Sequence, residues 1–524
     1  MAERQIDSIQ EAVRTGMYVA YWARLMPDAT ALIGRQGRLS YAELNAQSNR
    51  LAHGLRALGM KMGDALALLA PNTFEFAMVL MATRRIGIRL TPLNVHLGAD
   101  EIAYILRDSN ARTFVASARY AQAASAAARN APALQDLLAT EGDIVGFRSF
   151  DALLAQSDAS DVSDPVLGVN MLYTSGSTGK PKGVERASSA PPPAAPSAAP
   201  WPGGYRPGLD LHLCTGPLYH AAPLSYSMVL PFIGGAGIVL MDGWDAEDAL
   251  RSIATYRVTH THMVPTMFHR LLALPEATRA RYDVSSLSFV LHGAAPCPIP
   301  LKRAMIEWLG PIIYEYYGAT EGVGTFVDSA TWLQKPGTVG RPQPPDQVRV
   351  LDEDGRDAPV GVAGSIYLKT LPGAAFRYHN DDDKTRAAFR GDYFTLYDIG
   401  YLDQDGYLFL TDRSANLIIS GGVNIYPAET DAVLITHPAV LDVGVIGIPN
   451  PEWGEEVKAV VELREGFAPS PELGQELIEF CRARLAHYKC PRSVDFVAKL
   501  PRYDNGKLYK QVLRESYRRR SGEH

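Results

Sequence analysis

Residues Tyr173 to Val184 read YTSGSTGKPKGV and follow a short apolar stretch, Val169 to Leu172, that is typical of a buried strand. The segment combines serine and threonine hydroxyls with two lysines and three glycines. Such a loop can surround a phosphate group with backbone N–H and hydroxyl donors. It is not a Walker A loop, because Pro181 stands where Ser or Thr would hold magnesium. The segment therefore predicts a phosphate site of another kind, in a turn that follows a strand.

The first 150 residues alternate between helical and strand patterns. Ser40 and Glu43 have the spacing of a capping box, so a helix is predicted to begin there. The strands predicted after it are DALALLAPN, RLTPLN and ARTFVAS, and the helices between them are TFEFAMVLMATRRIGI and GADEIAYILRDSN. This alternation predicts βαβ units and a largely parallel sheet. Further along, we predict helices over Thr255 to Leu274 and Pro300 to Gly310, and strands over Ser288 to Leu291 and Ile312 to Tyr316.

The 524 residues exceed the size of a single hydrophobic core, so at least two domains are expected. After Arg413 the pattern changes to short strands, around Val443 to Ile448 and Val457 to Glu462, followed by a helix that begins at Ser470-Pro471. We therefore predict an α/β protein with a large N-terminal domain, 1–413, that has parallel-rich sheets. A small, mobile α+β domain, 414–524, is predicted to follow it. Residues 188–208 are rich in proline and alanine and predict a surface loop.

Composition excludes several classes of protein. Acidic residues number 57 and basic residues 51, and the resulting net charge of -6 argues against a nucleic-acid-binding protein. The four cysteines show no CxxC spacing, which indicates a reducing compartment. The charged first ten residues do not resemble a signal peptide, and the most apolar stretch, Tyr226 to Met241, is interrupted by proline and glycine. A soluble cytoplasmic protein with no membrane span is expected.

Several further motifs accompany the phosphate loop. HGAAP spans His292 to Pro296 and YGATE spans Tyr317 to Glu321, and YDIGYLDQDGYLFLTDR, SGGVNIYPAE and PRYDNGKLYK follow in that order. Together these motifs resemble those of the adenylate-forming (ANL) superfamily, which includes acyl-CoA synthetases, luciferase and the adenylation domains of peptide synthetases. The resemblance extends from about Ser40 to the end of the chain, across both predicted domains.

The resemblance implies a role for each matching residue in nucleotide binding. Tyr317 stands in the place of the ring that stacks on adenine, Asp398 in that of the ribose-binding carboxylate, and Glu321 in that of the Mg²⁺ ligand. A carboxylate is the hard oxygen ligand that Mg²⁺ requires, and Thr174 is a second predicted ligand of the metal. The implied nucleotide-binding residues are Thr174, Ser175, Gly176, Ser177, Thr178, Gly179, Lys182, Gly293, Ala294, Ala295, Tyr317, Gly318, Ala319, Thr320, Asp398 and Arg413.

Other matching positions are assigned to the acid, to coenzyme A and to catalysis. Lys507 resembles the lysine that contacts the carboxylate and the α-phosphate, where an ammonium stabilises developing charge. His220 matches a position at the mouth of the acyl pocket, although a histidine between apolar residues is as often a core residue. Gly421 and Gly422 resemble the turn that lines the pantetheine tunnel, which favours coenzyme A over a carrier protein. The candidate acyl-pocket residues are Tyr219, Tyr226, Cys297 and Gly322.

The activity implied is that of an AMP-forming acyl-CoA synthetase that uses ATP, Mg²⁺ and coenzyme A. The carboxylate attacks the α-phosphorus to give acyl-AMP and pyrophosphate, and the small domain then rotates so that the thiol of coenzyme A displaces AMP. Aromatic and small residues around Tyr219 and Gly318 indicate a hydrophobic acid that is fatty, aromatic or polycyclic. One alternative is a stand-alone adenylation enzyme that loads a carrier protein, and another is an adenylate-binding protein without turnover.

The sequence departs from the family pattern at three places. Leu396-Tyr397-Asp398 replaces the usual Thr-Gly-Asp, so a large ring stands where glycine leaves room beside the nucleotide. At the hinge, Ala415 and Asn416 replace the usual charged residues. The Thr-His usually found after the phosphate loop is absent. These departures lead to the hypothesis that adenylation is slow or lost and that the enzyme mainly converts a supplied acyl-adenylate into the thioester.

Overall fold

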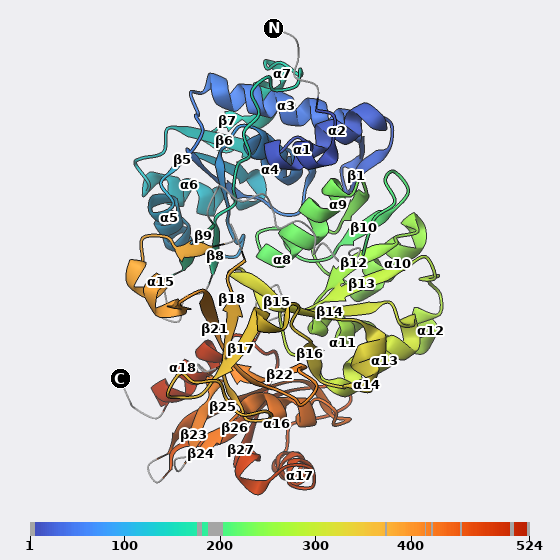
Figure 1. The fold of residues 1–524 in the computed structure, drawn as a ribbon, viewed down its shortest axis with the longest axis vertical. Coiled ribbons are helices and arrows are strands. Elements are labelled where there is room, and N and C mark those ends of the chain that lie inside the picture. The colour runs from blue at the N-terminus through green and yellow to red at the C-terminus, as the bar shows by residue number, and fades with distance from the viewer. Residues whose placement is uncertain are drawn as a thin grey trace.

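The structure is a computed structural model in which mixed α/β layers form a large upper body and a smaller lower body (Figure 1). The strands of the described residues form five sheets. The first and second sheets are mainly parallel, and the others are mainly antiparallel. This agrees with the predicted α/β class. The residues described by the structure are 6–174, 181–186, 203–371, 375–413, 416–420, 423–450, 453–502 and 508–520.

The first sheet confirms the predicted βαβ units. All its neighbouring strands pair in parallel, in the order β4-β3-β5-β6-β7. The Ser40 hydroxyl accepts the N–H of Glu43 while the Glu43 carboxylate accepts the N–H of Ser40, so the capping box is present. The strands are β3 (Ala65–Leu69), β4 (Arg89–Pro92), β5 (Ala111–Ser117), β6 (Asp136–Thr140) and β7 (Arg148–Ser149). The helices around them are α1 (Ile9–Thr15), α2 (Tyr18–Leu25), α3 (Tyr41–Ala57), α4 (Phe74–Arg85), α5 (Ala99–Asp108), α6 (Ala121–Arg129) and α7 (Phe150–Ala155).

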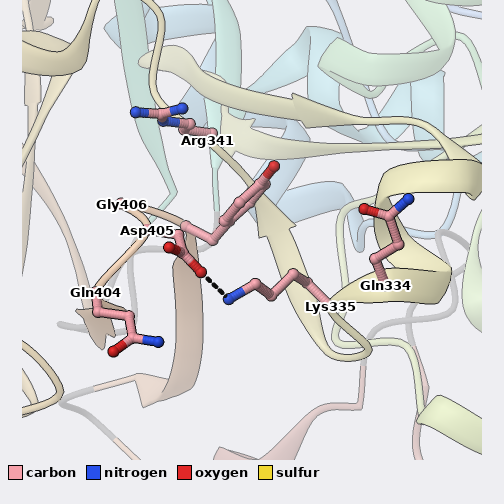
Figure 2. Close-up of a pocket in the computed structure, with 7 residues that line it drawn as sticks. Gln334, Lys335, Arg341, Gln404, Asp405 and Gly406 are labelled. Carbon is pink, nitrogen blue, oxygen red and sulfur yellow. Dashed lines mark hydrogen bonds and ion pairs between the residues drawn. The ribbon is translucent and has the colours of Figure 1, made fainter.

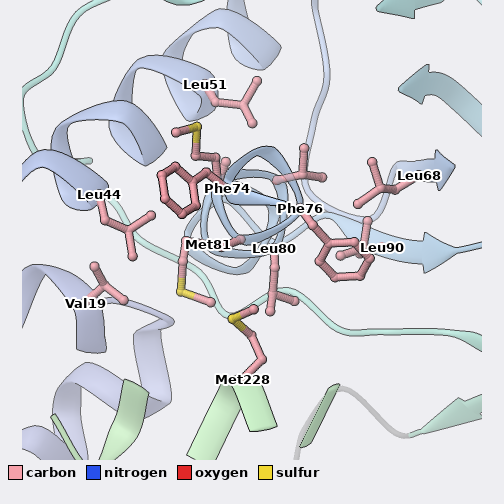
Figure 3. Close-up of a cluster of buried hydrophobic side chains, with 14 of the residues drawn as sticks. Val19, Leu44, Leu51, Leu68, Phe74, Phe76, Leu80, Met81, Leu90 and Met228 are labelled. Atoms are coloured by element: carbon pink, nitrogen blue, oxygen red, sulfur yellow. The ribbon is translucent and has the colours of Figure 1, made fainter. Parts of the chain in front are cut away.

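Helix α4 is buried on most of its faces, which explains why its sequence is apolar almost throughout (Figure 3). Phe76, Leu80 and Met81 are fully buried in a cluster that joins the first sheet to helices α2 and α3. Met228, from the helical segment Ser225–Val229, packs into the same cluster. The burial of these side chains fixes the first sheet against the second.

The second sheet has the order β15-β14-β13-β12-β10-β11-β1-β2, and its central strands are parallel. Its strands are β1 (Thr30–Gly34), β2 (Gly37–Ser40), β10 (Leu211–Cys214), β11 (Gly237–Leu240), β12 (His260–Met263), β13 (Phe289–His292), β14 (Ile313–Ala319) and β15 (Gly322–Val327). The helices that follow these strands are α8 (Ala221–Leu224), α9 (Leu230–Ile233), α10 (Ala246–Tyr256), α11 (Pro265–Ala273), α12 (Glu276–Arg279), α13 (Ile299–Leu309) and α14 (Ser329–Gln334).

One predicted helix in this region is wrong. The stretch from Thr255 to Leu274 contains the tail of α10, strand β12 and helix α11 rather than one helix. His260 to Met263 are buried on both faces of a central parallel strand, but three of the four residues are polar in type, so no continuous apolar run reveals the strand. The other predicted elements, from Ser288 to Leu291, from Pro300 to Gly310 and from Ile312 to Tyr316, are confirmed as β13, α13 and β14.

Two further sheets of the residues before 414 are antiparallel. A three-stranded sheet pairs the strands on both sides of the phosphate loop with a distant strand: β8 (Leu172–Thr174), β9 (Lys182–Arg186) and β19 (Phe376–Tyr378). Helix α15 (Asp382–Ala388) follows β19. The other sheet contains β16 (Thr338–Gly340), β17 (Val348–Leu351), β18 (Gly364–Lys369), β20 (Phe389–Arg390), β21 (Tyr393–Leu402) and β22 (Leu408–Arg413).

The C-terminal residues form a fifth sheet of their own, drawn in orange and red at the bottom of Figure 1. The predicted strands are present in a long antiparallel pair, and Ser470 caps the predicted helix by accepting the N–H of Leu473. The elements are β23 (Ile418–Ser420), β24 (Val423–Ile425), β25 (Val440–Asn450), β26 (Gly454–Leu463), β27 (Ser493–Val497), α16 (Pro427–Leu434), α17 (Pro471–Arg482) and α18 (Lys510–Arg520).

Among the described residues, no helix combines the length and the apolar character needed to cross a membrane. The four cysteines, Cys214, Cys297, Cys481 and Cys490, are all free thiols. The predicted hinge at Ser414-Ala415 and residues 188–202 of the predicted loop over 188–208 lie outside the described residues.

Candidate active site

The turn after β13 carries the predicted adenine-side residues. A Cβ atom on Gly293 would lie 2.5 Å from Cε1 and 2.7 Å from the carbonyl oxygen of Tyr316, so only glycine fits against strand β14. Ala294 has a φ of 67°, a left-handed conformation that non-glycine residues rarely adopt. The turn of Gly293, Ala294 and Ala295 is therefore held closely against the strand that leads to Tyr317.

Tyr317 and Asp398 are in direct contact. The Tyr317 hydroxyl donates a hydrogen bond of 2.8 Å to Oδ2 of Asp398, and both residues are buried. They come from different sheets, since Tyr317 belongs to β14 and Asp398 to β21. In β22, Arg413 is the register partner of Asp398. The structure thus brings together the residues predicted to bind adenine and ribose, which are far apart in the sequence.

Gly318, Ala319, Thr320 and Gly322 form the tight hairpin between β14 and β15. A Cβ on Gly318 would lie 2.6 Å from the carbonyl oxygen of Gly322, and one on Gly322 would lie 2.7 Å from Cζ of Phe394. The carbonyl oxygen of Thr320 accepts a hydrogen bond of 2.7 Å from Arg186 at the end of β9. This hairpin therefore connects the nucleotide residues of β14 with the strand that follows the phosphate loop.

Glu321, the predicted metal ligand, lies at the tip of the same hairpin. Its Oε1 accepts a hydrogen bond of 2.9 Å from the hydroxyl of Tyr378 in β19. Burial, and then the Glu321 charge, raise the pKa of Tyr378, so this hydroxyl stays a donor. Glu321 and the Thr174 hydroxyl at the end of β8 are hard oxygen donors that suit Mg²⁺. No group of three or more His, Cys, Asp or Glu side chains that could hold a metal occurs in the described part of the chain.

Lys182 forms an ion pair across the three-stranded sheet. Its Nζ donates to Oδ2 of Asp381 at 2.6 Å, and Lys182 is the register partner of Thr174. The predicted loop residues Ser175, Gly176, Ser177, Thr178 and Gly179 lie outside the described residues, but both strands that bracket them are described. Thr174 and Lys182 therefore mark the base of the loop.

The predicted acyl-pocket residues separate into two groups. Tyr226 belongs to an aromatic cluster, with its ring centroid 5.7 Å from that of His262 in a stacked arrangement and 4.8 Å from that of Tyr316. Burial lowers the pKa of His262 to about 3, so it is neutral at physiological pH. Tyr219 is buried next to His220, with ring centroids 4.8 Å apart. Cys297 instead packs against the core between the second sheet and helices α11 and α13.

Tyr397 occupies an unusual position beside this site. Its φ of 62° lies in the left-handed region that favours glycine, and the residue is 40% exposed. In the pairing of β18 with β21, Tyr367 is the partner of Thr395 and Ser365 the partner of Ile399, so β21 bulges at Tyr397. Burial, and then the charges of neighbours that include Glu321, raise the pKa of Tyr397. The ring that replaces the usual glycine is therefore partly exposed and within electrostatic range of Glu321.

Replacing Tyr397 by glycine is expected to speed acid-dependent pyrophosphate release, by about tenfold if ring crowding costs about 1.4 kcal/mol in the first transition state. Tyr397→Ala is the matched control, because it removes the ring but keeps a side chain at positive φ. The glycine variant should also be more stable than the alanine variant by about 1 kcal/mol in chemical denaturation. Equal pyrophosphate release in the wild type and both variants would show that the ring does not obstruct ATP.

Several predicted site residues cannot be placed from the described part of the chain. Lys507, Gly421 and Gly422 are outside the described residues, as is the side chain of Arg413. Their predicted roles remain predictions. Conversely, sequence analysis missed Tyr378, Asp381 and Lys384, which approach the site from β19 and α15. Only the pairing of β9 with β19 could have revealed them, and it joins segments almost 200 residues apart.

The hollow shown in Figure 2 is a different feature of the large domain. It has a volume of about 670 Å³ and is lined by polar residues. Lys335 pairs there with Asp403 at 2.8 Å and also with Asp405. The lining residues are Gln334, Lys335, Arg341, Gln404, Asp405, Gly406 and Tyr407, and none of them is a predicted site residue.

Comparison with known proteins identifies the family. A model of the AMP-binding enzymes matches residues 19–377, and a model of their C-terminal domain matches residues 429–507. The chain belongs to the AMP-binding enzymes. This AMP-binding enzyme is 34% identical over 491 residues to long-chain-fatty-acid–CoA ligase FadD13 of Mycobacterium tuberculosis (strain H37Rv), covering 92% of this chain and 93% of the relative.

Two further relatives of this AMP-binding enzyme cover nearly all of the chain. Feruloyl-CoA synthase of Amycolatopsis sp. is 34% identical over 519 residues, which cover 94% of this chain and 97% of the synthase. A crystal structure of the anthranilate CoA ligase AuaEII in complex with anthranoyl-AMP superposes with a TM-score of 0.84 at 25% identity, covering 96% and 98% of the two chains. The predicted family and fold class are therefore confirmed.

Proposed function

We propose that this AMP-binding enzyme joins a hydrophobic carboxylic acid to coenzyme A through an acyl-adenylate. The observation that carries the proposal is the contact of Tyr317 with Asp398, because it joins the residues that the motifs predict for adenine and ribose. Glu321, predicted for the metal, lies in the hairpin that follows Tyr317. The relatives named above are CoA ligases or synthases, so an acid–thiol ligase is the reaction class that this family membership supports.

The same residues account for the steps of the reaction. Asp398 and Tyr317 would hold the nucleoside, and Lys182 and the phosphate loop would hold the phosphates. Mg²⁺, bound through Glu321, would neutralise charge on the triphosphate. Lys507 would stabilise the charge that develops on the α-phosphate as the carboxylate attacks. The domain over 414–524 would then turn about the hinge near Ser414-Ala415, bringing Gly421 and Gly422 to the site for coenzyme A.

The aromatic cluster around Tyr226 supports an aromatic or polycyclic acid over a linear one. Tyr226, Phe289, Tyr314 and Tyr316 gather on one side of the second sheet, where flat rings can stack on a flat substrate. Related proteins include a feruloyl-CoA synthase and an indoleacetate–CoA ligase, whose acids contain rings, but also a long-chain-fatty-acid–CoA ligase.

A panel of acids tests the proposal directly. The full chain is incubated with MgATP, coenzyme A and benzoates, cinnamates, indole acids, polycyclic acids or linear acids of increasing length. Pyrophosphate release and thioester mass are then measured. We expect a ring-containing acid to give both products with the highest kcat/KM. Failure of every acid to give either product, together with no thioester from synthetic acyl-AMP, would favour an adenylate-binding protein without turnover.

A second candidate is an enzyme that performs mainly the thioester step, which the ring of Tyr397 within electrostatic range of Glu321 favours. In that case synthetic acyl-AMP would yield thioester while no acid releases pyrophosphate. Robust acid-dependent pyrophosphate release would exclude this candidate. Comparing two acyl acceptors tests the carrier-loading alternative. That alternative requires acyl transfer to a phosphopantetheine-bearing carrier protein in preference to free coenzyme A.

A further inference from the structure

Lys384, on helix α15, lies close to the predicted metal ligand although no sequence motif indicates it. Its Nζ is 4.3 Å from the centre of the Tyr378 ring. The hydroxyl of that same ring donates to Oε1 of Glu321 at 2.9 Å. Lys384 is half-buried, and the charge of Glu321 is among the influences on its pKa. One aromatic ring thus connects this ammonium group with the carboxylate predicted to hold Mg²⁺.

Asp381 holds a second lysine beside the first. Its Oδ2 accepts from Nζ of Lys182 at 2.6 Å, and its Oδ1 accepts the backbone N–H of Lys384 at 3.0 Å. Lys182 is largely buried, with 16% of its side chain exposed. Because β8 and β9 bracket the phosphate loop and pair Thr174 with Lys182, this arrangement stands at the base of the loop. Two cationic side chains from distant segments therefore converge on one place.

The charges around this pair suit an anionic ligand. Burial lowers the pKa of Lys384, and the neighbouring Lys182 lowers it further, whereas Glu321 and Asp381 oppose the shift. Two half-buried ammonium groups repel each other unless negative charge lies between them. Asp381 already accepts the short hydrogen bond of Lys182. A ligand that carries several negative charges would relieve the repulsion and accept the remaining N–H donors of both lysines.

We propose that Lys384 acts with Lys182 as a two-lysine clamp on the β- and γ-phosphates of ATP and on the pyrophosphate that leaves. This inference rests on the proposed function, since it assigns the phosphates of the same reaction. Tyr317 and Asp398 are predicted to take the nucleoside, whereas Tyr378 and Lys384 approach Glu321 from β19 and α15. Lys384 therefore belongs to the phosphate side of the metal ligand.

The clamp would act on the leaving group. As the carboxylate oxygen bonds to the α-phosphorus, the bond from that phosphorus to the bridging oxygen breaks, and its electron pair remains on pyrophosphate. Fixed ammonium donors stabilise charge that accumulates in this way. The thioester step releases AMP and involves no β- or γ-phosphate. The clamp therefore affects one half-reaction and leaves the other unchanged.

Lys384→Gln tests the clamp through ligand binding and through the two half-reactions. Calorimetry with magnesium pyrophosphate and the KM for ATP should both show a weakening of about tenfold or more, as expected for a lost charge-assisted hydrogen bond. Lys384→Arg keeps the charge and should recover most of the affinity. Arg386→Gln, which removes an exposed cation from the same helix, is the matched control and should bind pyrophosphate like the wild type.

Thioester formation from synthetic acyl-AMP and coenzyme A should change by less than about twofold in Lys384→Gln, a small effect in free energy. An intact thioester step also verifies that the variant is folded. If Lys384→Gln does not fold, Lys384→Met, which keeps the apolar part of the side chain, replaces it in the same measurements. Unchanged pyrophosphate affinity in the folded variant would overturn the clamp. Pyrophosphate binding is measured without an acid, so it tests the clamp independently of the overall reaction. A wild type that makes no thioester would instead overturn the proposed function.

Discussion

Replacing Lys507 by methionine is expected to lower acid-dependent pyrophosphate release by about 100- to 1000-fold, the range observed when a single donor to developing charge is removed. Methionine keeps much of the length of the side chain but cannot donate to the α-phosphate. The loss should appear mainly in kcat, because the interaction forms as the carboxylate attacks. Single-turnover measurements of acyl-AMP formation, with an acid found active in the panel, are the appropriate assay.

The control for this prediction is the other half-reaction. Thioester formation from synthetic acyl-AMP should remain within about threefold of the wild type, since domain rotation would take Lys507 away from the site in that step. Lys499→Met, which changes an exposed lysine of the same C-terminal region, should leave both half-reactions intact. Equal losses in both half-reactions would instead indicate that Lys507 supports the structure of the domain and does not act on the α-phosphate.

The elements that sequence analysis predicted correctly are those with local signals. Ser40 and Ser470 are helix caps that depend on residues only three positions away, and both caps are formed. The central strands β3 and β13 are buried on both faces and were predicted, because their sequences are mainly continuous apolar runs. The strand at His260 to Met263 is buried in the same way but was missed, because three of its four residues are polar in type.

The candidate site divides in the same way. Motif resemblance predicts roles for Tyr317, Glu321 and Asp398; these roles remain predictions, although the structure places Tyr317 and Asp398 in contact. Tyr378 and Lys384 were not identified, because their place in the site depends on the pairing of β9 with β19, a contact between segments almost 200 residues apart. The left-handed φ of Tyr397 was also beyond sequence analysis, although the ring in place of glycine indicated the position.

A buried ion pair beneath the site gives the largest expected effect on stability. Lys302 of α13 is fully buried, and its Nζ donates to Oε2 of Glu315 at 2.6 Å. Its Nζ also lies 4.7 Å from the centre of the Trp332 ring. Glu315 is only two residues before Tyr317, and its Oε2 is 3.7 Å from Nε2 of His292, which directly precedes Gly293. The pair therefore supports both segments that carry the predicted adenine contacts.

Glu315→Ala is expected to lower the free energy of unfolding by about 3–5 kcal/mol, because Lys302 would be left as an unpaired charge in the core. The measurement is chemical denaturation followed by intrinsic fluorescence. Glu307→Ala, an exposed carboxylate on the same helix as Lys302, is the matched control and should change stability by less than about 0.5 kcal/mol. A cost below about 1 kcal/mol for Glu315→Ala would mean that Lys302 reaches water in the variant, and that the pair contributes little to stability.

The double variant Glu315→Ala, Lys302→Met separates the charge from the packing. Because desolvation of two ions consumes most of their mutual attraction, an apolar replacement of both should recover most of the stability lost in the single variant. Nucleotide affinity provides the functional readout. If the pair also orients β14, the double variant should be stable yet bind ATP more weakly than the wild type, because Tyr317 and the turn at Gly293 would lose a fixed anchor. If ATP affinity is unchanged in the stable double variant, packing of β13 and β14 alone positions these residues.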